Sequence, residues 1–258
     1  MYKLISVNKN YILEGVVVIN DEKHLGFTLA EVLITLGIIG VVAAITIPTL
    51  MTKVEESVLV RQLKAAHSIF SRAYKMAINE EGDPLTWDIG DKDTAEGALK
   101  LYKILTKYLK VGEQCETREG CFYEGDYKAL FSSKWRWHPG THNKYARGIL
   151  SNGMSFLFWS NGSGCPNDLC GSLMIDINGY KKPNQAGVDY FAFTIRKDGS
   201  IRGSDTILEP NAYGETCKHG DTSDINGKNC TAWVLQMGNM DYRRRDITND
   251  WKRFKGVQ

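Results

Sequence analysis

The sequence predicts an α+β fold in which a long amino-terminal helix precedes a small antiparallel β-sheet head that is stapled by disulfides. An apolar segment over residues 27–51 is followed by a helical repeat that runs to residue 81. After residue 150, runs rich in β-branched and aromatic residues alternate with Asn-Gly and Asp-Gly pairs, which favour hairpin turns. The 258 residues therefore suit one globular head with an appendage.

The apolar segment runs from Phe27 to Met51 and contains a single charged residue, Glu31. As a helix, a segment of about 25 residues rises about 37 Å, which exceeds the roughly 30 Å hydrocarbon core of a bilayer. A carboxylate in such a helix costs roughly 2.5 to 3.5 kcal/mol. A signal peptide would instead have a shorter apolar core that ends in a small-residue cleavage site. The segment therefore predicts a membrane span in which Glu31 needs a partner.

The start of this segment, Gly26-Phe27-Thr28-Leu29-Ala30-Glu31, resembles the processing site of type IV pilins and type II secretion pseudopilins. The resemblance implies that a prepilin peptidase cuts after Gly26 and methylates the new amino-terminal residue, Phe27. It also implies that Glu31, the fifth residue of the mature chain, takes part in assembly. The charged amine of Phe27 in a neighbouring subunit is a suitable partner for the Glu31 carboxylate where water is scarce. Pro48 falls where many members carry a helix-softening proline.

The same resemblance implies a structural subunit of a type II secretion pseudopilus or a type IV pilus-like filament, and no enzyme. Residues 1–26 would be a leader, 27–51 a transmembrane and filament-core helix, 52–81 its amphipathic continuation packed on the sheet, and 82–258 the extracytoplasmic head. We expect a single-pass protein of the bacterial cytoplasmic membrane that later enters a filament. The expected partners are other pilin-like subunits, the prepilin peptidase, the membrane assembly machinery and membrane lipids.

Two alternatives stay open from the sequence. One is a minor pilin for adhesion or DNA uptake, and the other is a membrane-anchored extracytoplasmic enzyme or binding protein. The lysines of the leader are balanced by acidic residues, so either the leader is atypical or translation starts downstream. Catalysis has little support because no G-x-S-x-G motif or phosphate-binding loop occurs. His138 and His142 enclose a Pro-Gly pair that disfavours a helical zinc site.

Charge gives little support for nucleic acid as a partner. The formal net charge is +2, and 24% of the residues are charged, so no overall basic surface is expected. Near the carboxyl end, basic residues lie among aromatic ones: Arg243, Arg244, Arg245, Lys252, Arg253 and Lys255. Asp241, Asp246 and Asp250 offset half of that charge, which indicates a solvated face rather than a nucleic-acid site.

The apolar positions over residues 52–81 recur at three- and four-residue steps, which is typical of an amphipathic helix. Gly82-Asp83-Pro84 supplies its end. A second helix is predicted over residues 94–110. Strands are predicted over residues 153–160, 172–177, 190–196, 200–203 and 231–236.

All six cysteines follow the apolar segment, which suggests that the head matures in an oxidising compartment. Their spacing favours bridges between sequence neighbours: Cys115 with Cys121, Cys165 with Cys170, and Cys217 with Cys230. Zinc is the competing interpretation. Only Cys165 and Cys170 have a common zinc-ligand spacing, so disulfides are preferred.

The segment over residues 176–193 contains a D-x-N-G turn and a later P-N-x-x-G-x-D stretch, and it resembles a recurring segment of pilin-like heads. Oxygen-bearing side chains at alternate positions around a glycine suit calcium, with Asp176, Asn178 and Asp189 as the first ligands to test. The same residue types also form turns by hydrogen-bonding their own backbone. Calcium at this turn is therefore a hypothesis that competes with a purely structural turn, and no other cofactor is expected.

Overall fold

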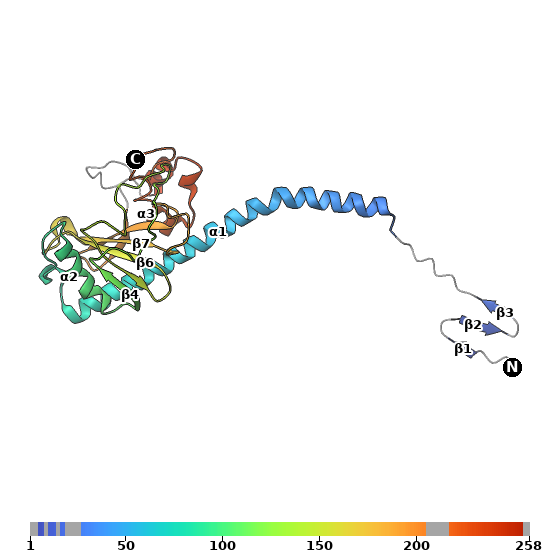
Figure 1. The fold of residues 1–258 in the computed structure, drawn as a ribbon, viewed down its shortest axis with the longest axis horizontal. Helices are drawn as coiled ribbons and strands as arrows, with labels where there is room; N and C mark the ends of the chain where they lie inside the picture. Colours follow the sequence, from blue (N-terminus) through green and yellow to red (C-terminus); the bar gives the residue numbers. More distant parts are fainter. Residues whose placement is uncertain (1–4, 8–9, 14–15, 19–26, 205–216, 255–258) are drawn as a thin grey trace. The chain divides into compact units, whose positions relative to one another are not determined.

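The computed structural model describes residues 5–7, 10–13, 16–18, 27–204 and 217–254. The chain divides into two compact units, Met1–Met51 and Thr52–Gln258, which are described in turn. Helix α1 (Leu29–Glu81) contributes residues to both units (Figure 1).

The first unit contains a three-stranded antiparallel sheet ahead of α1, in the order β1-β2-β3. Its strands are β1 (Ile5–Val7), β2 (Asn10–Leu13) and β3 (Val16–Val18). The sequence analysis did not predict strands in the leader. The signal was present, since this stretch is rich in β-branched residues that favour pleated structure.

In the second unit, α1 continues without interruption to Glu81, and Pro48 lies inside the helix earlier along the chain. Its buried face is an apolar stripe that comprises Leu63, Ala66, Phe70, Ala73 and Ala77. The chain leaves the helix at Gly82, whose φ of +84° is a conformation that glycine adopts without a Cβ clash. The stripe faces the sheet of the head.

The head is built on one six-stranded antiparallel sheet in the order β4-β5-β6-β7-β8-β9, so each strand pairs with the next in the chain. This confirms the predicted α+β fold with an antiparallel head. The strands are β4 (Val111–Glu116), β5 (Ala146–Leu150), β6 (Ser155–Ser160), β7 (Leu169–Asp176), β8 (Tyr190–Arg196) and β9 (Ile201–Gly203).

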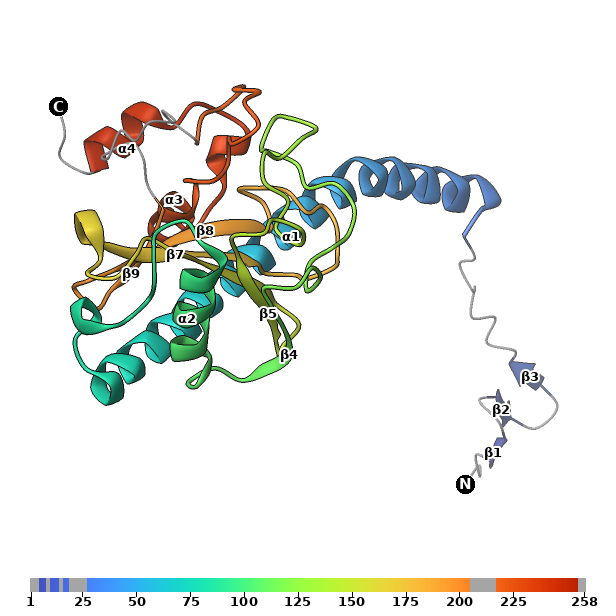
Figure 2. The same cartoon turned by 60° about the vertical axis from the view of Figure 1, so that its left-hand side comes forward.

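Side chains alternate along each strand, so the sheet has two faces, and different segments of the chain pack on them. On one face, the ring of Phe70 in α1 lies 5.4 Å from the ring of Phe156 and 6.1 Å from that of Phe158. Helix α2 (Ala95–Thr106) packs on the same face, where Tyr102 stacks 5.9 Å from Phe156. The other face carries a second, smaller core under the segment between β4 and β5. Figure 2 shows both helices beside the sheet.

One predicted strand was wrong. Residues 231–236 belong to helix α3 (Thr231–Met237), which ends at Gly238 with a φ of 68°. Four consecutive residues from Thr231 to Val234 are buried, and periodicity alone cannot assign such a short, continuously buried run to a strand or a helix. The remaining short helices are η1 (Pro84–Thr86), η2 (Pro166–Asp168), η3 (Asp241–Arg243) and α4 (Thr248–Phe254).

Two strands escaped prediction. In β4, Gly112, Glu113 and Gln114 are exposed, so no apolar alternation marks the strand. In β5, Arg147 is fully buried, and its guanidinium donates to the backbone carbonyl of Arg118 at 2.6 Å. A charged residue at a core position conceals the strand pattern.

Three disulfides staple the head, and they join the pairs that the spacing favoured. They are Cys115–Cys121, Cys165–Cys170 and Cys217–Cys230. Together with the long apolar helix and the antiparallel sheet, they fit a pilin-like fold.

Candidate functional site

The beginning of α1 forms a capping box, in which two residues satisfy each other's polar groups at a helix start. One carboxylate oxygen of Glu31 accepts hydrogen bonds from the backbone N–H and the hydroxyl of Thr28, each at 2.8 Å. The backbone N–H of Glu31 donates to the Thr28 hydroxyl at 3.2 Å. The carboxylate is thereby held within one helical turn of Phe27, where a new amine would appear after the expected cut. Gly26 lies outside the described residues.

The first half of α1, here residues 29–51, exposes apolar side chains all around its axis. Leu33, Ile34 and Ile39 are each at least 60% exposed, and successive residues on a helix are rotated by about 100°. Such a helix is expected inside a protein core or a membrane rather than in water. Within the described residues, α1 is long and apolar enough to cross a bilayer. The helix fits a membrane-anchored protein.

The three calcium candidates come together at the loop between β7 and β8. Asp189 accepts hydrogen bonds from the side-chain amide of Asn178 at 3.1 Å and from the backbone N–H groups of Asn184 at 2.8 Å and Gln185 at 2.6 Å. Asp176 accepts from the hydroxyl of Tyr127 at 2.7 Å and the backbone N–H of Asn178 at 3.2 Å. Both carboxylates therefore fasten the loop.

Burial dominates the electrostatics of this loop. It raises the pKa of Asp176 well above its ordinary value, with a further increase from the charge of Asp189. Burial also raises the pKa of Asp189, against the hydrogen bonds that it accepts. No ion pair with a basic side chain offsets either carboxylate in the part of the chain that the structure describes. The pair gains stability from a proton or from a bound cation.

The described residues bring one group of other metal-ligating side chains together, namely Glu113, Cys115 and Cys121. The two sulfur atoms are bonded to each other, so they are not thiolate ligands. His138 and His142 do not act together either. The Nε2 atom of His138 contacts the carbonyl of Gly125 at 3.0 Å, whereas His142 stacks on Tyr145.

Two members of the basic cluster near the carboxyl end, Arg244 and Arg245, form ion pairs. The guanidinium of Arg244 contacts the carboxylate of Glu56 on α1 at 2.7 Å, and Glu56 also accepts from the backbone N–H of Met240 at 2.8 Å. The hydrogen bond from Arg244 lowers the pKa of Glu56. Arg245 pairs with Asp241 and Asp250. These contacts fasten the end of the chain to α1 and neutralise two of the arginines that could contact a phosphate backbone.

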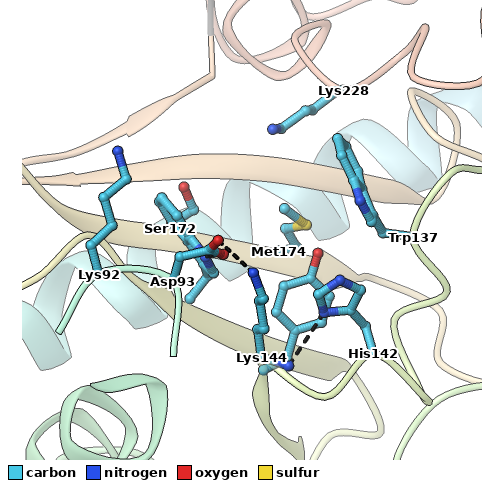
Figure 3. A pocket seen from close by; sticks show the side chains of 10 residues that line it. Lys92, Asp93, Trp137, His142, Lys144, Ser172, Met174 and Lys228 are labelled. Atoms are coloured by element: carbon cyan, nitrogen blue, oxygen red, sulfur yellow. Dashed lines mark hydrogen bonds and ion pairs between the residues drawn. The ribbon is translucent and has the colours of Figure 1, made fainter. Parts of the chain in front are cut away.

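A pocket of about 350 Å³ opens on the sheet face opposite α1 (Figure 3). Its floor is Ser172 and Met174 of β7, with Trp159 of β6 beside them. Lys92 and Asp93 come from the loop before α2, and four side chains come from the segment that leads into β5: Trp137, His142, Lys144 and Tyr145. Lys228 lines it from beyond β9. Sequence reasoning missed this pocket, although residues 134–144 are rich in aromatic and basic side chains.

The groups of the pocket are fixed by one another. The carboxylate of Asp93 receives the ammonium of Lys144 at 2.5 Å and the indole N–H of Trp159 at 2.9 Å. The hydrogen bond from Lys144 lowers the pKa of Asp93, so this carboxylate is ionised at neutral pH. Burial lowers the pKa of His142, which keeps its imidazole neutral. The pocket therefore combines ordered indole rings with positive charge.

An apolar helix that continues into a disulfide-stapled α+β head fits a membrane-anchored protein of pilin-like fold. Residues 23–47 match the family model described as the prokaryotic N-terminal methylation motif. This match supports the type IV pilin-like and pseudopilin family, and it points to a structural subunit. The motif implies processing by a prepilin peptidase and assembly with other pilin subunits. No curated protein and no solved structure matches the chain.

Proposed function

We propose that the chain is a structural subunit of a type II secretion pseudopilus or a type IV pilus-like filament. A prepilin peptidase removes residues 1–26 by cutting between Gly26 and Phe27, and the amine of Phe27 is then methylated. The helix over residues 27–51 holds the subunit in the cytoplasmic membrane and later packs in the filament core. The head lies outside the cytoplasm, which agrees with its three disulfides.

The observation that carries this proposal is the exposed apolar half of α1 with one carboxylate at its start. Such a helix requires lipid or other helices around it. A neighbouring subunit supplies both apolar surface and the Phe27 amine that Glu31 can pair with. A plain membrane anchor would need no carboxylate, because a lone charge there costs roughly 2.5 to 3.5 kcal/mol.

The test is to shear filaments from the surface of cells, if necessary cells that overproduce the assembly machinery, and to look for the chain in the sheared fraction. We expect the chain in the sheared fraction of cells with the prepilin peptidase and only in the membrane fraction of cells without it. Equal recovery in the sheared fraction from both strains would contradict the proposal. Loss of protein secretion in cells that lack the chain would assign it to a secretion pseudopilus, and loss of surface attachment to a pilus.

The pocket on the sheet face opposite α1 favours a second candidate within this class, a minor pilin for adhesion. The second half of α1 packs on the other face of the sheet and leaves this face to the pocket. A binding pocket there is of use to a filament that contacts a surface, whereas a purely structural subunit needs none.

We also propose that calcium binds the loop between β7 and β8. The support is the buried carboxylate pair of Asp176 and Asp189, which lacks a basic partner among the described residues. The side-chain oxygen of Asn178 is buried there without a hydrogen-bond partner. Carboxylate and amide oxygens are the ligands that calcium prefers. Comparing the melting temperature in calcium and in chelator tests the proposal.

A further inference from the structure

Two lysines of the pocket opposite α1 have no carboxylate partner in the part of the chain that the structure describes. Lys144 is paired with Asp93. Among the described residues, Lys92 and Lys228 form no ion pair, and their ammonium groups lie over indole rings instead. The distances are 6.0 Å from Lys92 to the ring of Trp159 and 5.7 Å from Lys228 to that of Trp137.

Lys228 has the stronger need for an anion. Burial lowers the pKa of its ammonium group, because the protonated form has lost part of its water. An anionic ligand in the pocket would restore the lost stabilisation with charge-assisted hydrogen bonds. Figure 3 shows Lys228 and Trp137 on one side of the pocket and Asp93 with Lys144 on the other, with Met174 between them.

The aromatic side chains of the pocket indicate the shape of the ligand as well as its charge. The ring of Trp159 cannot rotate freely because its N–H is bonded to Asp93, so its face is presented in one orientation. A ligand with one apolar C–H face and polar groups around its edge fits such a wall. Ser172 and the Asp93 carboxylate offer hydrogen bonds to hydroxyl groups. A pyranose ring has this distribution of apolar and polar atoms.

The size of the pocket limits the ligand. About 350 Å³ lies near the lower end of the roughly 300 to 1,000 Å³ range of small-molecule sites. A single-stranded nucleic acid instead needs a basic groove that follows several phosphates. The ionised Asp93 in the wall opposes a polyphosphate, and Arg244 and Arg245 are already paired elsewhere.

We propose that this pocket binds a carboxylated sugar, such as a uronic or sialic acid unit of a surface glycan. The carboxylate lies against Lys228 and Lys92, and the C–H face of the ring packs on Trp159. The inference concerns the head of the unassembled chain, so it stands or falls independently of filament assembly.

Calorimetric titration of the purified full-length chain in detergent tests the proposal, with glucuronate and glucose as ligands that differ in the carboxylate. We expect saturable binding of glucuronate, with glucose weaker by about tenfold or more because it lacks the charge. Lys228→Met keeps the aliphatic stem and should weaken glucuronate binding by about tenfold. Lys75→Met, which alters an exposed lysine of α1 outside the pocket, should leave binding unchanged.

Three outcomes would overturn the proposal. They are no binding of either sugar, equal binding of glucuronate and glucose, and undiminished binding by a Lys228→Met variant whose melting temperature is that of the parent. A single-stranded oligothymidylate serves as a further ligand. If the oligothymidylate binds and glucuronate does not, and if Lys228→Met abolishes this binding, the pocket is a nucleic-acid site. That result would refute the proposal that it binds a sugar.

Discussion

The two halves of α1 carry similar apolar side chains but have opposite surroundings. In the first half, Ile34 and Ile39 are 62% and 63% exposed, and the large apolar side chains from Val32 to Met51 are all between 41% and 70% exposed. In the second half, Leu63 and Phe70 are at most 1% exposed and form a stripe against the sheet. The head therefore buries the apolar side chains of the second half within the same chain. No described residue covers the first half, and in the proposed function lipid or other subunits surround it.

The largest effect should follow from Glu31→Ala, which removes the one charge of the exposed half. We expect insertion and cleavage to continue, because the apolar helix and the cut site are intact. Incorporation into filaments should fall below detection, since the amine of Phe27 loses its partner. The measurement is the amount of chain in the sheared filament fraction. Glu55→Ala, an exposed glutamate on the same helix, is the matched control and should assemble normally.

Alanine substitutions in the two halves should differ sharply in their effect on the head. Phe70→Ala should lower the free energy of unfolding by about 3 to 5 kcal/mol, because it leaves a cavity between α1 and the rings of Phe156 and Phe158. Ile39→Ala should leave head stability unchanged. Denaturant unfolding of the full-length chain in detergent measures both. Equal effects would show that the halves are not distinct.

Calcium should stabilise the head by about 2.7 kcal/mol at a hundredfold excess over its dissociation constant, which raises the melting temperature by several degrees. Asp176→Asn should abolish this increase. In chelator, stability of the parent should fall as pH rises from about 4, because the raised pKa values of Asp176 and Asp189 make the folded state bind more protons than the unfolded one. The same melting temperature in calcium and in chelator would rule out calcium binding at this loop.

The smallest effect concerns the link between the second half of α1 and the end of the chain. Arg244→Ala should cost about 1 to 2 kcal/mol, a modest value because the guanidinium is 54% exposed. The contribution should be present above pH of about 4.3 and disappear as pH falls through the lowered pKa of Glu56, because protonation removes the charge. Arg253→Ala, which removes an exposed arginine of α4, is the control. Unfolding of both variants at pH 7 and pH 3 checks this prediction.

Local patterns were sufficient for the parts of the fold that depend on local sequence. The apolar run from Phe27 and the stripe through Phe70 indicate α1, and strands β6, β7 and β8 follow alternating or β-branched runs between glycine turns. Strand β4 is polar and mostly exposed, and β5 has the buried Arg147, so their identity depends on neighbouring strands. The run from Thr231 to Val234 was predicted as a strand but forms a helix. Its residues are all buried, so the sequence shows no alternation of apolar and polar residues that would separate a strand from a helix.

The candidate sites differ in the same way. Phe27 and Glu31 lie within one turn of helix, so their relation can be read directly along the chain. The calcium candidates are near in sequence, but the donors that hold them include Tyr127, which is distant along the chain. The pocket draws Lys92, Trp159 and Lys228 from separate segments, and two loops that fold over the sheet bring them together. Sequence spacing contains no signal for that arrangement.

The proposed function requires that the mature protein begins with a processed amino terminus at the exposed half of α1. Mass spectrometry of the chain isolated from membranes and from filaments tests it directly. We predict a mature chain that starts at Phe27 and carries one methyl group on its amine. An intact bond between Gly26 and Phe27 in the isolated protein would contradict the account.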